Sequence, residues 1–176
     1  MGAGKTTVGR MLARRLGLRF LDSDHEIQER CGVTIPVIFD IEGEAGFRAR
    51  EEQVVAELSA QQGIVLATGG GAVLSGRNRE CLAERGTVVY LKGEPEELSR
   101  RLSGDRNRPL LAGGDRLARL RALHEIRDPL YRSIADLIVE SGARSAQALA
   151  RDLLARLAEA GSSQAPTGAQ PGNHDH

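Results

Sequence analysis

One short glycine-rich segment constrains this chain more than any other feature of its sequence. Gly2-Ala-Gly-Lys-Thr-Thr7 stands at the start of residues 5–16, where apolar side chains recur at helical spacing and a glycine, Gly17, follows. The segment matches the last part of the phosphate-binding loop GxxxxGK[ST], in which backbone N–H groups and a helix N-terminus surround phosphate oxygens. A glycine-rich turn that only caps an ordinary helix is the alternative.

In such a loop the residue types divide the work of holding a nucleotide. A lysine reaches the β- and γ-phosphates, and the following threonine offers its hydroxyl to Mg²⁺. We expect Lys5 and Thr6 to take these roles. The nucleotide-binding residues expected here are Gly2, Ala3, Gly4, Lys5, Thr6 and Thr7.

The beginning of this loop would lie ahead of the printed sequence. Its first glycine would fall two positions before Met1, and an apolar strand normally precedes that glycine. We therefore expect about ten further residues before Met1. Without such a strand we expect the chain to fold poorly or to bind ATP weakly, because a central strand contributes much of a domain's apolar burial.

Beyond the loop, short apolar runs alternate with helical patterns. The expected strands are 19–22, 64–67, 87–91 and 136–139, and the expected helices are 5–16, 25–31, 43–60, 76–84, one after Pro95, and 146–160. This alternation predicts a three-layer α/β/α P-loop NTPase fold with a parallel sheet and right-handed crossovers. We expect one domain over residues 1–160 and a disordered tail over 161–176, where no aliphatic side chain is larger than alanine.

Composition excludes several classes of partner. Basic and acidic residues number 24 each, so no net charge attracts the chain to nucleic acid or to an acidic membrane. The sequence contains no apolar run of about 18 residues and no signal-peptide pattern. We expect a cytoplasmic, monomeric protein whose partners are small molecules, and two reduced cysteines, Cys31 and Cys81, without a chemical role.

Two further clusters carry groups suited to phosphoryl transfer to a hydroxyl. Phe20-Leu-Asp-Ser-Asp24 ends an expected strand, whose alternation would place Asp22 and Asp24 on one face. Arg48 and Glu51 lie three residues apart on an expected helix, where the guanidinium could bind a substrate carboxylate. Solvated aspartates or helix caps, and a surface ion pair, are the respective alternatives.

The order of these motifs resembles the shikimate kinase family. The segments that carry the resemblance are GAGKTT, FLDSD, EGEAGFRAREE, GGGA at 69–72, RNRPLL at 106–111 and RDPLY at 127–131, and they extend from Met1 to about Leu157. The combination is more specific than any single motif, because other small-molecule kinases share only the first. A gluconate-type or nucleotide kinase, or a nucleotide-binding module without turnover, remains an alternative.

The resemblance implies a substrate site over about 24–60, with ATP and shikimate as the small-molecule substrates. Asp22 would assist Mg²⁺ together with Thr6, and Asp24 would bind the shikimate hydroxyl as base. The other substrate-binding residues implied are Phe47, Arg48, Glu51, Gly69, Gly70, Gly71 and Arg127. A plain turn after a strand is the alternative for the three glycines.

A loop rich in arginine and glycine follows, over about 103–115. Its composition predicts a mobile, cationic lid, and the resemblance implies that Arg108 contacts the ATP phosphates while Arg101 and Arg144 flank adenine. A solvated or RNA-binding loop is the alternative, although aromatic residues make up only 3% of the chain and offer no stacking platform. The implied reaction is phosphorylation of the 3-hydroxyl of shikimate by ATP, with Lys5 and Arg108 stabilising charge.

Overall fold

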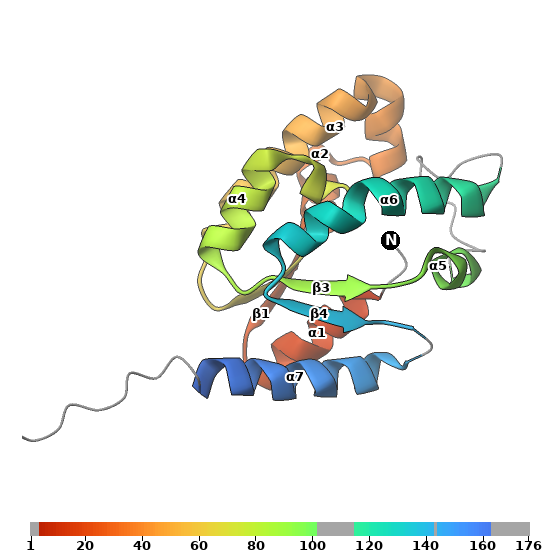
Figure 1. Ribbon diagram of the computed structural model, residues 1–176. Coiled ribbons are helices and arrows are strands. Elements are labelled where there is room, and N and C mark those ends of the chain that lie inside the picture. Colours follow the sequence, from red (N-terminus) through yellow and green to blue (C-terminus); the bar gives the residue numbers. More distant parts are fainter. Residues whose placement is uncertain (1–3, 102–114, 143, 163–176) are drawn as a thin grey trace, which may run out of the picture.

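The computed structural model describes residues 4–101, 115–142 and 144–162, drawn as ribbon in Figure 1. In chain order the elements are α1 (Lys5–Leu16), β1 (Arg19–Asp22), α2 (Ser23–Cys31), α3 (Ile35–Ser59), β2 (Ile64–Ala67), η1 (Ala72–Leu74), α4 (Gly76–Arg85), β3 (Val89–Lys92), α5 (Pro95–Arg101), α6 (Arg116–Ile134), β4 (Leu137–Glu140) and α7 (Ala146–Ser162). Strands and helices alternate as predicted, and the fold class is α/β with parallel strands.

The described strands form two parallel pairs. Strand β1 pairs with β2 in the register Arg19↔Ile64, and β3 pairs with β4 in the register Val89↔Leu137. Helices α1 and α7 lie on one side of these strands and α4 and α6 on the other, as Figure 1 shows. The single parallel sheet expected from the sequence is therefore present as two separate pairs among the described residues.

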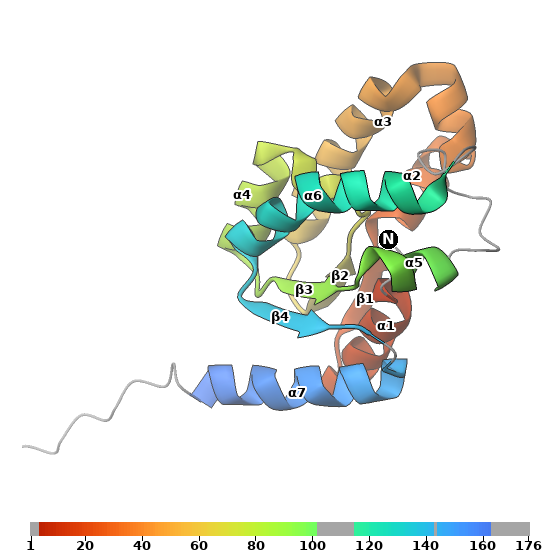
Figure 2. The same cartoon turned by 45° about the vertical axis from the view of Figure 1, so that its right-hand side comes forward.

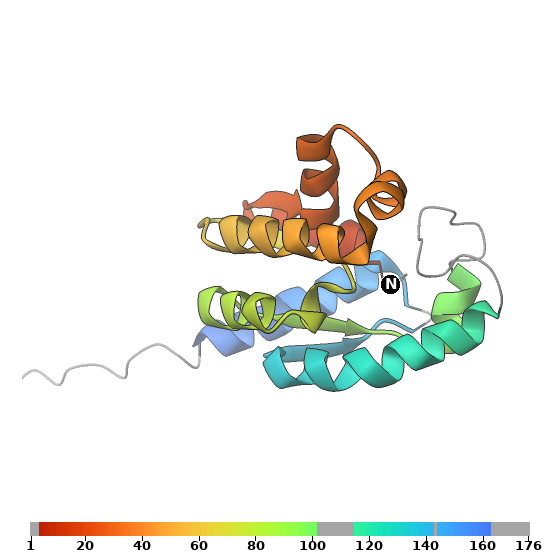
Figure 3. The same cartoon turned by 90° about the horizontal axis from the view of Figure 1, so that it is seen from above.

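One apolar core joins the two strand pairs. Its buried members come from α1, α7 and β4, and residues of β2 and β3 pack against them; the set is Val8, Leu12, Val139, Leu149, Ala150 and Leu153, with Val65, Val89 and Leu91. A second core lies under α2 and α3 and contains Ile27, Ile38, Phe47, Val54 and Leu58. Helices α3 and α4 run side by side (Figures 1 and 3). The second core supports the segment that carries Arg48 and Glu51.

The helical regions differ from the expectation at three places. Helix α6 was not predicted, because Pro129 lies inside it and proline normally ends a helix. Helix α3 starts at Ile35 and bends at Gly43, whose φ of 72° and ψ of −177° are not helical. Helix α7 ends at Ser162, within the expected tail, and residues 163–176 lie outside the described part.

Candidate active site

The end of the glycine-rich loop leads directly into α1. Gly4 has a φ of 82°, a left-handed conformation that favours glycine, and its carbonyl accepts the first helical hydrogen bond from Val8 N at 2.9 Å. The first turn of α1 contains no acidic residue, so no carboxylate of its own neutralises the positive end of the helix dipole. Lys5 begins this helix. The N-terminus of α1 is therefore suited to binding phosphate.

Asp22 is held between α1 and α2. One carboxylate oxygen accepts a hydrogen bond from the Thr6 hydroxyl at 2.9 Å, and the other accepts from the backbone N–H groups of Asp24 and His25 at 3.0 and 3.3 Å. These backbone bonds cap α2, which starts at Ser23. The prediction that Asp22 and Asp24 share a strand face was wrong, because Asp22 caps α2 and Asp24 already lies in that helix.

Asp24 nevertheless reaches the expected substrate region, because α2 is tied to the triple glycine. The buried Ser23 hydroxyl accepts a hydrogen bond from Gly69 N at 3.2 Å. A Cβ placed on Gly69 would lie 2.6 Å from Asp24 Oδ1 and 2.9 Å from Glu51 Oε1. Two carboxylates therefore lie against Gly69, and only a residue without a side chain allows this approach.

Arg48 and Glu51 form a partly buried ion pair, so the surface-pair alternative does not apply. Arg48 Nη1 donates to Glu51 Oε2 at 2.6 Å, and the Glu51 side chain is 1% exposed. Burial raises the pKa of Glu51, although Arg48 opposes the shift. Arg48 also lies 5.2 Å from the ring centroid of buried Phe47 and donates to Glu44 at 3.1 Å. The guanidinium is thus held in one orientation.

Arg127 comes to the same region from α6. It is only 4% exposed, and burial lowers the pKa of its guanidinium. One helical turn later, the Tyr131 hydroxyl donates to the carbonyl of Gly70. A cavity of about 120 Å³ is lined by Lys5, Gly69, Gly70, Arg127 and Tyr131, among others. Residues predicted for the phosphate side and for the substrate side therefore border one space.

Three buried polar atoms in this region have no hydrogen-bond partner among the described residues. They are Arg48 Nε, Glu51 Oε1 and Arg127 Nε. Buried polar groups are nearly always satisfied in folded proteins, since an unpaired one costs about 1–3 kcal/mol. Two guanidinium donors and one carboxylate acceptor are therefore available to a ligand that carries both an acid and a hydroxyl group.

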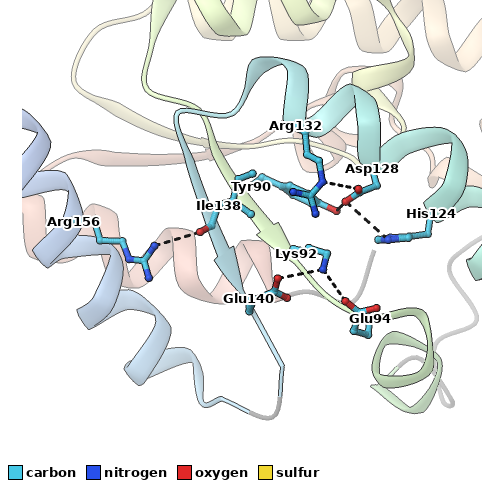
Figure 4. A network of polar contacts seen from close by, with 9 residues as sticks. All are labelled: Tyr90, Lys92, Glu94, His124, Asp128, Arg132, Ile138, Glu140 and Arg156. Atoms are coloured by element: carbon cyan, nitrogen blue, oxygen red, sulfur yellow. Dashed lines mark hydrogen bonds and ion pairs between the residues drawn. The ribbon is translucent and has the colours of Figure 1, made fainter.

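A polar network behind the cavity fixes α6 against β3 (Figure 4). The Tyr90 hydroxyl donates to Asp128 at 2.9 Å, Arg132 Nε donates to the same carboxylate at 2.7 Å, and His124 lies 3.9 Å away. Burial alone would raise the pKa of Asp128, but the bonds from Arg132 and Tyr90 outweigh it and lower the pKa. This network positions the helix that carries Arg127.

Sequence reasoning did not assign roles to Ser23, Tyr90, Asp128 or Tyr131. Tyr131 shares the helical face of Arg127 because it follows that residue by four positions in α6, a helix that the sequence did not predict. The others depend on contacts between distant segments. Ser23, for example, meets Gly69 from 46 residues away.

Several predicted site residues are not placed in the cavity. Gly2, Ala3 and Arg108 lie outside the described residues, as does the side chain of Arg101. Arg144 is exposed and donates to Asp152 of α7 at 3.2 Å. Thr7 is exposed in the first turn of α1, beside Thr6.

The oxygen atoms of Thr6 and Asp22 suit a hard cation such as Mg²⁺, which prefers oxygen ligands and keeps several waters. Within the described ranges no cluster of three or more histidine, cysteine or acidic side chains could hold a metal ion by itself. The oxygen atoms of Thr6 and Asp22 therefore suit a cation whose other ligands are mostly water molecules and the oxygens of a bound phosphate. No described helix is both long and apolar enough to span a bilayer.

Comparison with known proteins identifies relatives that share one family description. The family model described as shikimate kinase matches residues 1–158. The shikimate kinase of Thiobacillus denitrificans is 60% identical over 157 residues, which cover 89% of this chain and 86% of that protein. The shikimate kinase of Ralstonia nicotianae is 54% identical over 171 residues, covering 97% and 90%.

A solved structure, shikimate kinase from Acinetobacter baumannii in complex with shikimate, matches with a TM-score of 0.89 at 51% identity. The match covers 91% of this chain and 89% of that one. The family match over residues 1–158 includes both strand pairs and all the residues of the candidate site described above.

Proposed function

The chain belongs to the shikimate kinase family, and we propose which of its residues carry out the reaction. It transfers the γ-phosphoryl group of ATP to the 3-hydroxyl of shikimate, giving 3-phosphoshikimate and ADP, a step of aromatic amino acid biosynthesis. The assignment of individual residues follows from the geometry around Gly69–Gly71.

Arg48 and Arg127 bind the shikimate carboxylate. The observation that carries this assignment is the pair of buried, unpartnered Nε atoms on two arginines from different helices. Guanidinium groups bind carboxylates through charge-assisted hydrogen bonds of about 1.5–3 kcal/mol each. Glu51 orients Arg48, and Phe47 supports it from the ring face. Gly69, Gly70 and Gly71 let the substrate approach their backbone closely.

Asp24 receives the proton of the attacking hydroxyl. As the bond from O3 of shikimate to the γ-phosphorus forms, the bond from that phosphorus to the β-phosphate oxygen breaks and ADP leaves. The proton moves from the hydroxyl to the Asp24 carboxylate, which lies against Gly69 beside Glu51. Positioning and charge stabilisation supply most of the rate enhancement in such a transfer.

The donor side is formed by Gly2–Thr7, with Lys5 on the β- and γ-phosphates. Thr6 and Asp22 would hold Mg²⁺, directly or through water, and the bound ion would neutralise charge on the phosphate oxygens. We assign Arg108 to the transferring phosphoryl group and Arg101 and Arg144 to the adenine side. We further propose one domain over 1–160 with a lid at about 103–115, a disordered tail that begins after the end of α7 at Ser162, and a monomeric, cytoplasmic enzyme.

A coupled ADP-release assay with shikimate, quinate and gluconate tests the acceptor assignment. Turnover with shikimate and little or none with gluconate is expected, because the rigid ring of shikimate holds its carboxylate and its acceptor hydroxyl at a fixed separation, whereas gluconate is an open chain that must be ordered on binding. Arg127→Ala should lower kcat/KM for shikimate, because one carboxylate-binding arginine is lost. Equal kcat/KM for shikimate and gluconate would contradict a site that recognises the carboxylate and the hydroxyl of one cyclic acid together.

A further inference from the structure

The triple glycine lies in a four-residue turn whose two ends are fixed by side chains. Ala72 N donates to the carbonyl of Gly69 at 3.2 Å and closes the turn. At its first residue, Gly69 N donates to Ser23 Oγ at 3.2 Å, and at its last residue the Ala72 carbonyl accepts from Asn78 Nδ2 at 3.0 Å. Both side chains are buried. Only the central peptide of the turn can therefore rotate without moving an anchored group.

The central residues of this turn, Gly70 and Gly71, are compatible with two forms of it. In a type I turn the third residue has φ of about −90° and ψ of about 0°, whereas in a type II turn its φ is about +80° and the central peptide is reversed. Glycine adopts both conformations, and type II turns favour glycine at this position. The local sequence therefore does not select the type I form.

The structure contains the type I form. Gly71 has φ of −94° and ψ of −9°, and the φ of Gly70 is negative, which excludes the mirror-image turns. The carbonyl of Gly70 accepts a hydrogen bond from the Tyr131 hydroxyl of α6. In the type II form this carbonyl would point away from α6, and the bond would be lost. The Tyr131 hydroxyl therefore favours type I over type II.

Tyr131 is held so that its hydroxyl stays on the Gly70 carbonyl. Its ring stacks on that of buried Tyr90, with the ring centroids 4.7 Å apart. Burial raises the pKa of Tyr131, so the hydroxyl remains protonated and can donate. Helix α6, which carries Tyr131, lies beside α4, the helix that follows the turn (Figure 2). The donor is thus fixed by packing as well as by its hydrogen bond.

The orientation of the central peptide decides which backbone group faces away from α6. A trans peptide is planar, so the Gly71 N–H points opposite to the Gly70 carbonyl. Among the described residues, the N–H groups of Gly70 and Gly71 have no hydrogen-bond partner, whereas the three carbonyls of the triple glycine each accept one bond. Gly71 also lies against Arg48, since a Cβ placed on it would overlap the guanidinium. A backbone donor therefore lies beside an arginine whose Nε has no partner in the described part of the chain.

We propose that Tyr131 is a positioning residue for phosphoryl transfer to shikimate: its hydroxyl holds the central peptide of the turn in the type I orientation, so that the Gly71 N–H is offered to the carboxylate that Arg48 binds. The reversed peptide would present a carbonyl oxygen there, which would repel the substrate carboxylate and accept a bond from Arg48 in its place. This inference rests on the proposed binding of shikimate at the triple glycine.

Tyr131→Phe tests the proposal, because it removes the hydroxyl and keeps the stacked ring. In NMR spectra of the protein without ligands, the parental turn should give a strong NOE between the N–H protons of Gly70 and Gly71, as the type I form requires. Tyr131→Phe should weaken that NOE and strengthen the one from the Gly70 Hα protons to the Gly71 N–H, which marks the type II form. Ser133→Ala is the control, since it removes an exposed hydroxyl of the same helix that donates to a backbone carbonyl.

Steady-state ADP release measures the consequence for the substrate. The shikimate KM of Tyr131→Phe should rise by about 3–10-fold, the factor that corresponds to one neutral hydrogen bond, while the KM for ATP stays unchanged. Its melting temperature should fall by no more than a few degrees, because no apolar contact is removed. Ser133→Ala should keep both KM values and the parental NOE pattern.

Two results would overturn the proposal. The first is an NOE pattern that does not change in Tyr131→Phe; a raised KM would then come from Arg127, whose guanidinium interacts with the same hydroxyl. The second is a reversed turn with an unchanged shikimate KM. Absence of shikimate turnover in the parental protein would instead refute the proposed function, and the NOE measurement without ligands would still report on the turn.

Discussion

Replacing Gly71 with alanine should damage shikimate binding while leaving the fold nearly intact. The backbone of Gly71, with φ of −94° and ψ of −9°, is one that alanine adopts readily. Its new Cβ, however, would lie 2.5 Å from Arg48 Cζ and nearer still to both terminal nitrogens. Since favourable contacts between heavy atoms lie near 3.5–4.0 Å, the guanidinium must move by about 1 Å or more.

The size of the effect follows from what that movement breaks. It separates Arg48 Nη1 from Glu51 Oε2, now 2.6 Å apart, and turns Arg48 away from the substrate carboxylate. Loss of one charge-assisted bond in a desolvated site costs about 1.5–3 kcal/mol, which lowers kcat/KM for shikimate by about 10–150-fold. The Arg48 side chain is 19% exposed and can swing toward solvent, so the melting temperature should fall by only a few degrees.

The assay is steady-state ADP release at saturating ATP, with shikimate varied, alongside thermal melts of both proteins. Gly76→Ala is the matched control, because its Cβ would lie 3.6 Å from Arg79 Nη2, an ordinary contact, in the first turn of α4. Gly76→Ala should keep the parental KM, and neither variant should alter the KM for ATP. A normal shikimate KM in Gly71→Ala would refute the placement of Arg48 as a carboxylate ligand.

Three further substitutions test the site. Asp24→Asn should lower kcat by about 10²–10⁴-fold with ATP affinity retained by nucleotide titration, and near-normal turnover would remove Asp24 as base. Arg127→Ala should raise the shikimate KM by about 10–100-fold, and Arg127→Lys should recover part of that loss. An unchanged KM would argue against Arg127 as the second arginine that binds the shikimate carboxylate. Burial raises the pKa of Glu51 above its ordinary 4.5, so the parental protein loses stability as pH rises through the folded pKa. The melting temperature of Glu51→Gln minus that of the parent should therefore become more positive as the pH rises from 4.5. A difference that does not depend on pH would contradict the raised pKa of Glu51.

Much of the fold was predictable from local signals. The helical period and Gly17 placed α1, and the apolar run before the triple glycine placed β2, because propensity and capping act over a few residues. The same local rules failed at α6. Proline is compatible with a helix where tertiary contacts compensate, and bonds from Tyr90 and Arg132 to Asp128 hold the helix beside Pro129.

The candidate site was predicted in its residue types more than in its geometry. Motif order and resemblance identified Asp24, Arg48 and Arg127 as a set. The expected strand alternation could not show that Asp24 sits in a helix, since that depends on Asp22 capping α2. The buried character of the Arg48–Glu51 pair was also beyond the sequence, because an i, i+3 pair is identical on a surface and in a core.

By itself the sequence determined the chemistry available to this protein: a phosphate-binding helix start, acidic groups for a hydroxyl and a cation, and arginines for a carboxylate. Tertiary structure decided which of these groups meet. It placed Ser23 on Gly69, Tyr131 on Gly70 and Arg127 in a desolvated cavity. Such contacts join residues far apart in the chain, and their energies depend on burial and mutual orientation, which no local pattern specifies.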